Sequence, residues 1–261
     1  MKLFKSLAIL PLAIAMLPAA NAIAGDALAR IQQQKTIRVA VPVDYPPYGF
    51  VGGDMQPRGL DIDMAKHIAD KLAVKLELVP VTAPNRVAYI QTKKADLTIS
   101  SLGKTAEREK VIDYSIAYAP FFDAVFGAKA LQVKNFEEMA GKTVAVTRGS
   151  MQDKELDELA PKAVPRRFDD NNGSISAFRS GQTQMVAIGT TVVAAIKHRD
   201  PSLDIELKAI LSNAPCYIGM GKNEAELRTK INDIIRQAKA DGTIDAFSKK
   251  WLGAPAGQLP D

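Results

Sequence analysis

The chain has 261 residues, of which 47% are hydrophobic and 24% charged, a composition ordinary for a globular protein and unlike that of a disordered or fibrous one. Its formal net charge of +5 at pH 7 is small and evenly spread, which argues against a nucleic-acid-binding surface. Cys216 is the only cysteine, so an internal disulfide is excluded. We expect Cys216 to be a small buried hydrophobic residue.

The N-terminus has the pattern of a secretory signal. Two lysines precede an apolar run at 7–17, and small residues follow up to Ala24. Cleavage after Ala22 or after Ala24 fits equally well. The run is shorter than the roughly 20 residues that span a bilayer, and no cysteine near the cleavage sites could carry a lipid. We predict that residues 1–24 are removed and that the mature chain is soluble and periplasmic.

The first part of the mature chain alternates between strand and helix patterns. Apolar residues between Asp61 and Leu72 recur on one helical face, whereas 74–79 alternates charged and apolar residues as a half-buried strand does. The elements predicted here are strands at 37–41, 74–79 and 97–101 and helices at 61–72 and 86–93.

The same alternation restarts after a short helix that Asn135 and Glu138 can cap and that Gly141 ends. Ser150 and Asp153 form a capping box at the start of a longer helix. The elements predicted in this second part are strands at 143–146, 164–168 and 185–188 and helices at 150–160, 174–180 and 191–198.

The chain therefore contains two α/β units, each a mostly parallel sheet flanked by helices. Extended segments at 119–128 and 205–216 connect the units, and helices at 224–239 and 244–251 return to the first one. Ligands favour the cleft between two such units. The predicted domains are lobe 1 (25–119 plus 217–253), lobe 2 (120–216) and a C-terminal tail (254–261).

Catalytic and metal-binding patterns are missing from the sequence. It contains no nucleotide-binding glycine motif, no HExxH and no GxSxG. His67 and His198 have no nearby cluster of ligating residues, so we predict neither a metal site nor a cofactor. Asp169 and Asp170 precede Asn171, which favours a helix-entry loop over a catalytic carboxylate pair.

Three loops at strand ends carry the features of a binding site. The first runs from Ser100 to Arg108 and combines hydroxyls and backbone donors with a guanidinium that can grip a carboxylate in bidentate fashion. The second, 149–152, opens a helix, whose N-terminus favours anions. The third, 44–50, has stiffening prolines and aromatic residues that can form a stacking wall.

The chain resembles the polar amino-acid-type substrate-binding proteins of bacterial ABC importers, the family 3 solute-binding proteins. The resemblance covers nearly all of the mature chain. It rests on Ile37–Ala40, Tyr45–Tyr48, Gly59–Asp63, Lys94–Asp96, Ser100–Leu102, Glu107–Arg108, Val111–Ser115, Leu131–Val146, Gly149–Ser150, Ala240–Thr243 and Lys249–Gly253. It implies the type II periplasmic-binding-protein fold, with two α/β lobes joined by two hinge strands that close on a ligand.

The resemblance also implies a ligand site. The residues that match the family's ligand positions are the stacking aromatic Tyr45, the carboxylate donors Ser101, Gly103 and the Met151 N–H, the carboxylate-gripping Arg108, and Gln152 next to the second-lobe donor.

Two positions depart from the family pattern. Pro42 stands where members for basic or amide side chains often carry an aspartate, and Gly189 stands where most members hold the ligand's α-ammonium with an aspartate. A glycine supplies no counter-charge. Asp44 either compensates for this loss or faces solvent, and the sequence favours neither.

The predicted function is the capture of an amino acid or related small carboxylate by hinged closure, by a monomer that delivers it to the membrane permease of an ABC importer. One alternative is a periplasmic enzyme similar to cyclohexadienyl dehydratase, for which Asp44 or Asp123 would be the general acid. Another is a chemosensory receptor for a small organic acid.

Overall fold

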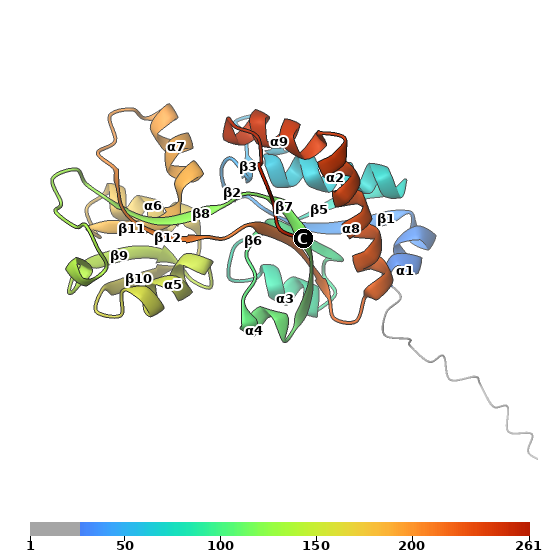
Figure 1. Cartoon of the computed structure of the whole chain (residues 1–261), viewed down its shortest axis with the longest axis horizontal. Coiled ribbons are helices and arrows are strands. Elements are labelled where there is room, and N and C mark those ends of the chain that lie inside the picture. The colour runs from blue at the N-terminus through green and yellow to red at the C-terminus, as the bar shows by residue number, and fades with distance from the viewer. Residues whose placement is uncertain (1–26) are drawn as a thin grey trace, which may run out of the picture.

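The chain folds around two separate five-stranded sheets, which lie in the two halves of the molecule in Figure 1. A computed structural model describes residues 27–261, so the predicted signal peptide and its cleavage sites lie outside the described residues. We call the first sheet with its helices lobe 1 and the second sheet with its helices lobe 2. The predicted two-lobed α/β fold is therefore confirmed.

The sheet of lobe 1 has four strands running one way and a single strand running against them. In spatial order the strands are β5 (Lys75–Val81), β1 (Thr36–Pro42), β6 (Leu97–Leu102), β13 (Cys216–Gly221) and β7 (Ile112–Ala119). β1 pairs in parallel with β5 and β6, whereas β13 pairs antiparallel with β6 and β7. A small sheet of β2 (Asp44–Tyr45), β3 (Gly49–Val51) and β4 (Pro57–Arg58) follows β1.

Helices cover both faces of the lobe 1 sheet. They are α1 (Ala27–Gln34), α2 (Leu60–Leu72), α3 (Arg86–Gln91), α4 (Ala106–Glu109), α8 (Ala225–Ala240) and α9 (Thr243–Leu252). α1, α2, α8 and α9 share one apolar core with β1 and β6, while α3 contributes to a second core on the opposite face. The C-terminal residues also pack here, because the Pro260 carbonyl accepts the Ala117 N–H at 3.1 Å.

Lobe 2 repeats the same plan. Its strands in spatial order are β10 (Val164–Phe168), β9 (Thr143–Thr147), β11 (Met185–Gly189), β8 (Phe122–Gly127) and β12 (Glu206–Asn213). β8 is the one strand that opposes the others. The helices are η1 (Glu137–Met139), α5 (Met151–Leu159), α6 (Asn171–Arg179) and α7 (Thr190–Arg199), with α5 on one face and α6 and α7 on the other.

The chain crosses between the lobes twice, and the two crossings touch. It leaves lobe 1 at residues 120–121, between β7 and β8, and returns at 214–215, between β12 and β13. The Ala214 N–H donates to the Phe121 carbonyl at 2.9 Å, so the two connections lie side by side. The predicted extended crossings at 119–128 and 205–216 are confirmed.

Two helix starts in lobe 2 follow from their capping residues. The Asp170 carboxylate accepts the Gly173 N–H at 2.7 Å, which confirms the helix-entry role and starts α6 three residues before the predicted 174. The Ser150 hydroxyl accepts the Asp153 N–H at 3.1 Å. In a standard capping box the Asp153 carboxylate would accept the Ser150 N–H. Here it accepts the Gly149 N–H at 3.0 Å, so the box is shifted by one residue.

The strand β7 was not predicted. Seven of its eight residues are buried, so it has no alternation of polar and apolar side chains from which to recognise a strand. The prediction for Cys216 is confirmed, since its thiol is buried and free.

A buried carboxylate joins β1, β6 and α1. Asp96 accepts the Arg38 N–H at 2.9 Å, the Arg38 Nη2 at 2.7 Å and the Arg30 Nη2 at 2.8 Å. Its side chain is 1% exposed, whereas the two arginines are about one-third exposed. Burial alone would raise the pKa of Asp96, but the hydrogen bonds from Arg38 and Arg30 outweigh it, so the pKa is lowered.

We expect Asp96→Asn to lower the free energy of unfolding by about 2 kcal/mol at pH 7. This is less than the usual cost of breaking a fully buried ion pair, because water screens the two partly exposed arginines. Because the folded-state pKa of Asp96 is lowered, its contribution is present above the unfolded value of about 3.9 and is lost as the pH falls through the folded value. Urea titrations at pH 7 and pH 3 measure this. Asp54→Asn, which breaks an exposed pair with Arg58, is the control and should change stability little. An equal effect of Asp96→Asn at both pH values would contradict the assignment.

Candidate functional site

A cleft between the lobes brings most of the predicted site residues together. It encloses about 440 Å³, including its solvent-open mouth, and residues from both lobes and both crossings line it. Six of the eight predicted residues are among them: Asp44, Tyr45, Ser101, Gly103, Met151 and Gln152. Pro42 lines it too, whereas Arg108 and Gly189 do not.

Tyr45 spans the cleft from lobe 1 to lobe 2. Its ring stacks on Phe121 of the first crossing, with centroids 5.9 Å apart and an interplanar angle of 17°. Its hydroxyl accepts the Gly189 N–H at 3.0 Å and the Gln152 Nε2 at 3.2 Å. Burial raises the pKa of Tyr45 well above its usual value, so the hydroxyl stays neutral. The aromatic ring predicted to cover a ligand therefore also fastens the lobes together.

The position of Tyr45 explains the glycine at 189. A Cβ on Gly189 would lie 2.9 Å from the Tyr45 Oη and 2.9 Å from the Phe121 Cζ. Both distances are shorter than ordinary van der Waals contact, and Phe121 is held in the ring stack. Any side chain at 189 would have to displace Tyr45 or Phe121 from this arrangement.

A buried aspartate shapes the lobe 1 loop at Ser101. Asp61 accepts the Ser101 N–H at 2.8 Å and the Tyr118 hydroxyl at 2.6 Å. Ser101 has a φ of +41°, a strained value for a residue with a side chain, and the Asp61 bond helps to hold it there. Burial raises the pKa of Asp61 to about 6. The Ser101 backbone donor is thus used inside lobe 1.

Arg108 lies at the edge of the cleft and joins the lobes. Its Nη1 donates to the Gly103 carbonyl at 2.7 Å, and its Nη2 donates to the Gly149 carbonyl of lobe 2 at 2.8 Å. Burial, followed by the nearby Arg86 charge, lowers the pKa of Arg108 to about 10. Beside it, the Lys154 ammonium pairs with Glu107 across the lobes at 2.7 Å.

Sequence reasoning missed the arginine that does line the cleft. Arg86, the first residue of α3, is 5% exposed. Its Nη1 donates to the Ser100 carbonyl and, at 3.4 Å, to the Ser101 carbonyl. Its Nε has no hydrogen-bond partner within the part of the chain that the structure describes. A cation in the first turn of a helix opposes the helix dipole, and this was the signal available in the sequence.

Arg86 also lacks a direct ion-pair partner in the described part of the chain. Of the carboxylates in residues 27–261, none forms an ion pair with it. Burial lowers the pKa of Arg86. A buried charge costs free energy unless it is paired, so an anion in the cleft would be favourable at this guanidinium.

Two carboxylates also line the cleft, Asp44 and Asp123. Asp44 is 6% exposed, so the solvent-facing alternative for it is wrong. Its Oδ2 accepts the Asn171 N–H at 2.7 Å across the lobes, while its Oδ1 is without a partner among the described residues. Asp123 is fully buried; its Oδ1 accepts the Gln152 side chain, and its Oδ2 is likewise without a described partner. Burial raises the pKa of both carboxyls, that of Asp123 well above its usual value.

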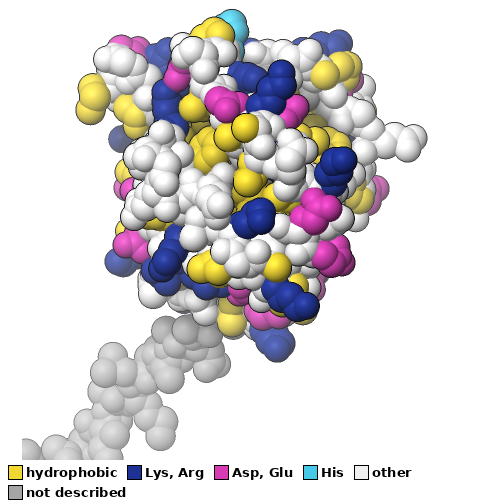
Figure 2. Space-filling model, turned by 90° about the vertical axis from the view of Figure 1, so that its left-hand side faces the viewer, with side chains coloured by type: hydrophobic (Ala, Val, Ile, Leu, Met, Phe, Trp, Pro, Cys, Tyr) yellow, Lys and Arg dark blue, Asp and Glu magenta, His cyan; other side chains and the backbone are white. Residues whose placement is uncertain are grey.

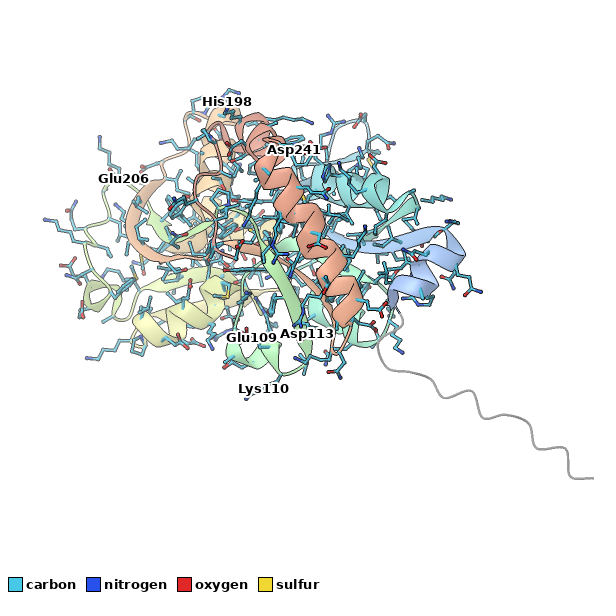
Figure 3. The ribbon with its side chains drawn as sticks, turned by 45° about the vertical axis from the view of Figure 1, so that its right-hand side comes forward. Glu109, Lys110, Asp113, His198, Glu206 and Asp241 are labelled. Carbon is cyan, nitrogen blue, oxygen red and sulfur yellow. The ribbon has the colours of Figure 1, made fainter. Side chains whose placement is uncertain are left out.

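Residues 27–261 show neither a metal-binding cluster nor a membrane-spanning helix. No group of three or more histidine, cysteine and acidic residues is arranged there to hold a metal ion. His67 packs edge-on against Phe247, and His198 lies at the outer edge of the molecule at the end of α7 (Figure 3). No helix in this range is long and apolar enough to cross a membrane. The outer end of lobe 2 mixes basic and acidic side chains (Figure 2).

Known proteins share this architecture. The family model for bacterial extracellular solute-binding proteins, family 3, matches residues 37–254. The L-cystine-binding protein TcyJ of Escherichia coli (strain K12) is 25% identical over 235 residues, which cover 87% of this chain and 86% of that protein. A mutant of ArgBP from T. maritima superposes with a TM-score of 0.81 at 29% identity, over 87% of this chain and 99% of its own.

A further solved structure bears on the enzyme alternative. The ancestral amino acid-binding protein AncCDT-1, a precursor of cyclohexadienyl dehydratase, superposes with a TM-score of 0.78 at 30% identity, over 86% of this chain and 98% of its own.

Because the family model spans most of the sequence, the chain belongs to the bacterial extracellular solute-binding proteins, family 3. Its role is accordingly that of a solute-binding protein, as the sequence predicted.

We expect Tyr45→Phe to shift the equilibrium between open and closed lobes toward open by about fivefold or more. The change removes one acceptor shared by Gly189 and Gln152, and a net hydrogen bond contributes about 1 kcal/mol. Single-molecule energy transfer between dyes on the two lobes measures the equilibrium. Tyr89→Phe, which alters a half-buried tyrosine of lobe 1 outside the cleft, should leave it unchanged. An identical distribution for Tyr45→Phe and the control would show that this bond does not hold the lobes.

Proposed function

We propose that the protein captures an amino acid or related small carboxylate in the cleft and delivers it to the permease of an ABC importer. One observation carries the proposal: Arg86 is a buried cation in the cleft wall whose Nε has no hydrogen-bond partner among the described residues. A ligand carboxylate would neutralise it and accept its unpartnered Nε–H. We also propose Arg108 as a second guanidinium for the same carboxylate. To bind it, Arg108 must release the carbonyl of Gly103 or of Gly149.

The remaining cleft residues have complementary roles in this proposal. The Ser101 hydroxyl and the Met151 N–H at the start of α5 are donors for the ligand's carboxylate, since a helix N-terminus favours an anion. Gly103 leaves room for Met151, because a Cβ there would lie 2.8 Å from the Met151 Cγ. Tyr45 covers the ligand, and Gln152 holds the Tyr45 hydroxyl.

Binding is coupled to lobe closure in this proposal. Several contacts connect the lobes near the cleft: Tyr45 to Gly189 and to Gln152, Arg108 to Gly149, Asp44 to Asn171 and Glu107 to Lys154. A ligand that touches both walls adds to these contacts only when the lobes are shut, so it shifts the population toward the closed form. A rotation about residues 120–121 and 214–215 is the matching hinge motion. The permease would recognise the closed form.

The setting of this function is also part of the proposal. We propose a cleaved signal peptide at 1–24, a periplasmic location and a monomeric protein. The names of relatives support an amino acid or a related compound as the ligand, because TcyJ is a cystine-binding protein and the ancestral neighbour is an amino acid-binding protein.

An enzyme is the second candidate, favoured by the likeness to a precursor of cyclohexadienyl dehydratase. Asp123 and Asp44 are buried carboxyls in the cleft with raised pKa values, as a general acid requires. Neither has a base positioned beside it as a partner in the part of the chain described. Turnover of prephenate or arogenate by the purified protein would establish the enzyme, and its absence would exclude that activity.

A thermal-shift screen across amino acids, dicarboxylates and opine-like compounds tests the binding function. At a concentration of about 100 times Kd, a specific ligand adds about 2.7 kcal/mol of stability, which corresponds to a rise in Tm of about 5 °C or more for a chain of this size. We expect at least one carboxylate to give this rise and its methyl ester or amide to give none. A screen in which no carboxylate raises Tm would contradict the proposal.

For that carboxylate, Arg86→Met should weaken binding by about 30-fold or more, since truncating one partner of a buried charge pair costs at least about 2 kcal/mol. The Tm of the unliganded variant should be the same or higher, because an unpaired buried charge is removed. Arg108→Ala should remove detectable binding in the same calorimetric titrations.

Arg148→Ala is the matched control, because Arg148 is exposed and pairs only with an exposed Asp169. It should bind like the wild type. Unchanged affinity in Arg108→Ala would show that the assignment of Arg108 is wrong, and unchanged affinity in Arg86→Met would remove the observation on which the proposed function rests.

A further inference from the structure

Resting on the proposed function, we propose that Asp123 binds a cationic amine of the ligand and thereby replaces the counter-charge that Gly189 does not supply. The ligand class that follows is a zwitterionic or cationic amino acid, as opposed to a simple organic acid.

Asp123 stands directly opposite Gly189 in the antiparallel pair of β8 and β11. Residues that are directly opposite in such a pair project from the same face of the sheet, with Cβ atoms roughly 5 Å apart. A carboxylate at Asp123 therefore occupies the same face as a side chain at 189 would, displaced by one strand. Asp123, on that face, is one of the residues that line the cleft.

The Asp123 carboxylate is held in place and incompletely bonded. Gln152 donates to its Oδ1, and the same Gln152 amide donates to Tyr45, which fixes the carboxylate relative to the cleft wall. Its Oδ2 is fully buried without a partner among the described residues. A buried acceptor left without a donor costs about 1–3 kcal/mol, and an ammonium group in the cleft would satisfy it with a charge-assisted bond.

The charges of the two cleft walls match a ligand with both an acidic and a basic group. Arg86 lies on the lobe 1 wall and Asp123 on the lobe 2 wall, so the carboxylate and the amine of one amino acid would each meet the opposite charge. Such a ligand connects the lobes through two ion pairs. An organic acid without an amine would leave the Asp123 Oδ2 unsatisfied.

The surroundings of Asp123 predict that its ionisation is linked to binding. The titratable and polar groups that act on it are Glu155 and Gln152 of α5, Arg86 of α3, Arg108 of α4, Tyr45 of β2 and Cys216 of β13. Burial and then Glu155 raise the pKa of Asp123 well above its usual value, and Arg86 and Arg108 only partly oppose this. A bound ammonium favours the ionised carboxylate, so it should expel a proton.

Asp44 is the competing carboxylate, because its Oδ1 also lacks a described partner. Its other oxygen is already bonded to the Asn171 backbone N–H and to the Asn171 side chain, at 2.7 and 3.1 Å, at the start of α6. Those contacts assign Asp44 to lobe closure. We therefore use Asp44→Asn as the matched variant.

Calorimetric titration of paired probes tests the inference. The probes are L-glutamate with glutarate, L-glutamine with 4-carbamoylbutanoate, and L-arginine with 5-guanidinopentanoate, each pair differing only in the α-amine. The wild type should bind the amine-bearing member of at least one pair about tenfold or more tightly. Asp123→Asn should abolish this preference, so that the two members of the pair bind with similar affinity. Asp44→Asn should keep the preference.

A second measurement uses only the wild-type protein, in case Asp123→Asn does not fold. Titrations in two buffers of different ionisation enthalpy give the number of protons released, which should be larger for the preferred amino acid than for its amine-free partner; equal release for both would contradict the inference.

Three affinity results would also overturn the inference: equal affinity for both members of every pair, a preference that persists in folded Asp123→Asn, or a preference lost in Asp44→Asn alone. If the wild type binds no carboxylate in the thermal-shift screen, the proposed function itself fails. If it binds carboxylates but the preference does not depend on Asp123, only the present inference fails.

Discussion

The hydroxyl of Tyr45 is the atom on which the closed cleft depends. It comes from lobe 1, accepts a backbone N–H and a side-chain amide from lobe 2, and belongs to a ring that stacks on the first crossing segment. Through Gln152 it is connected to Asp123, and through its position it determines that residue 189 is a glycine. One phenol group thus joins the lobes, positions the buried carboxylate and limits the side chain allowed on the neighbouring strand.

Around this centre the cleft combines charges that a folded interior does not normally leave unpaired. Arg86 is buried without a carboxylate partner in the described chain, and Asp44 and Asp123 each keep one buried oxygen without a donor. Groups of this kind lower stability by themselves. Their arrangement in a single cleft is understandable if a ligand supplies the missing charges, so that the same free energy that destabilises the unliganded cleft contributes to ligand affinity.

Much of the fold was predictable because its elements carry local signals. The alternation in 74–79, the helical face of 61–72 and the caps at Asp170 and Ser150 are properties of short segments, and each corresponds to an element in the structure. β7 was missed because a strand buried on both faces has no alternating pattern.

For the site, the sequence predicted which loops form it but not the roles of all its residues. The residues themselves identified the three loops and the family resemblance assigned positions within them, and six of the predicted residues do meet in one cleft. The roles of Arg86 and Asp61 depend on burial and on partners far away in sequence, which no segment pattern contains. Asp61, for example, appeared only as the start of a helix, yet it holds the backbone of Ser101, 40 residues further along the chain. The match at Gly189 was read as a missing charge, while the structure gives the steric reason for it in Tyr45.

That steric reason has an evolutionary consequence. An aspartate at 189 and a tyrosine hydroxyl over the same backbone N–H exclude each other, because even a Cβ at 189 lies 2.9 Å from the Tyr45 Oη. An aspartate at 189 therefore requires a second change in this cleft, because the tyrosine would have to shift or be replaced as well. Positions 45, 123 and 189 are therefore expected to be epistatic, and related sequences should vary at them as a set.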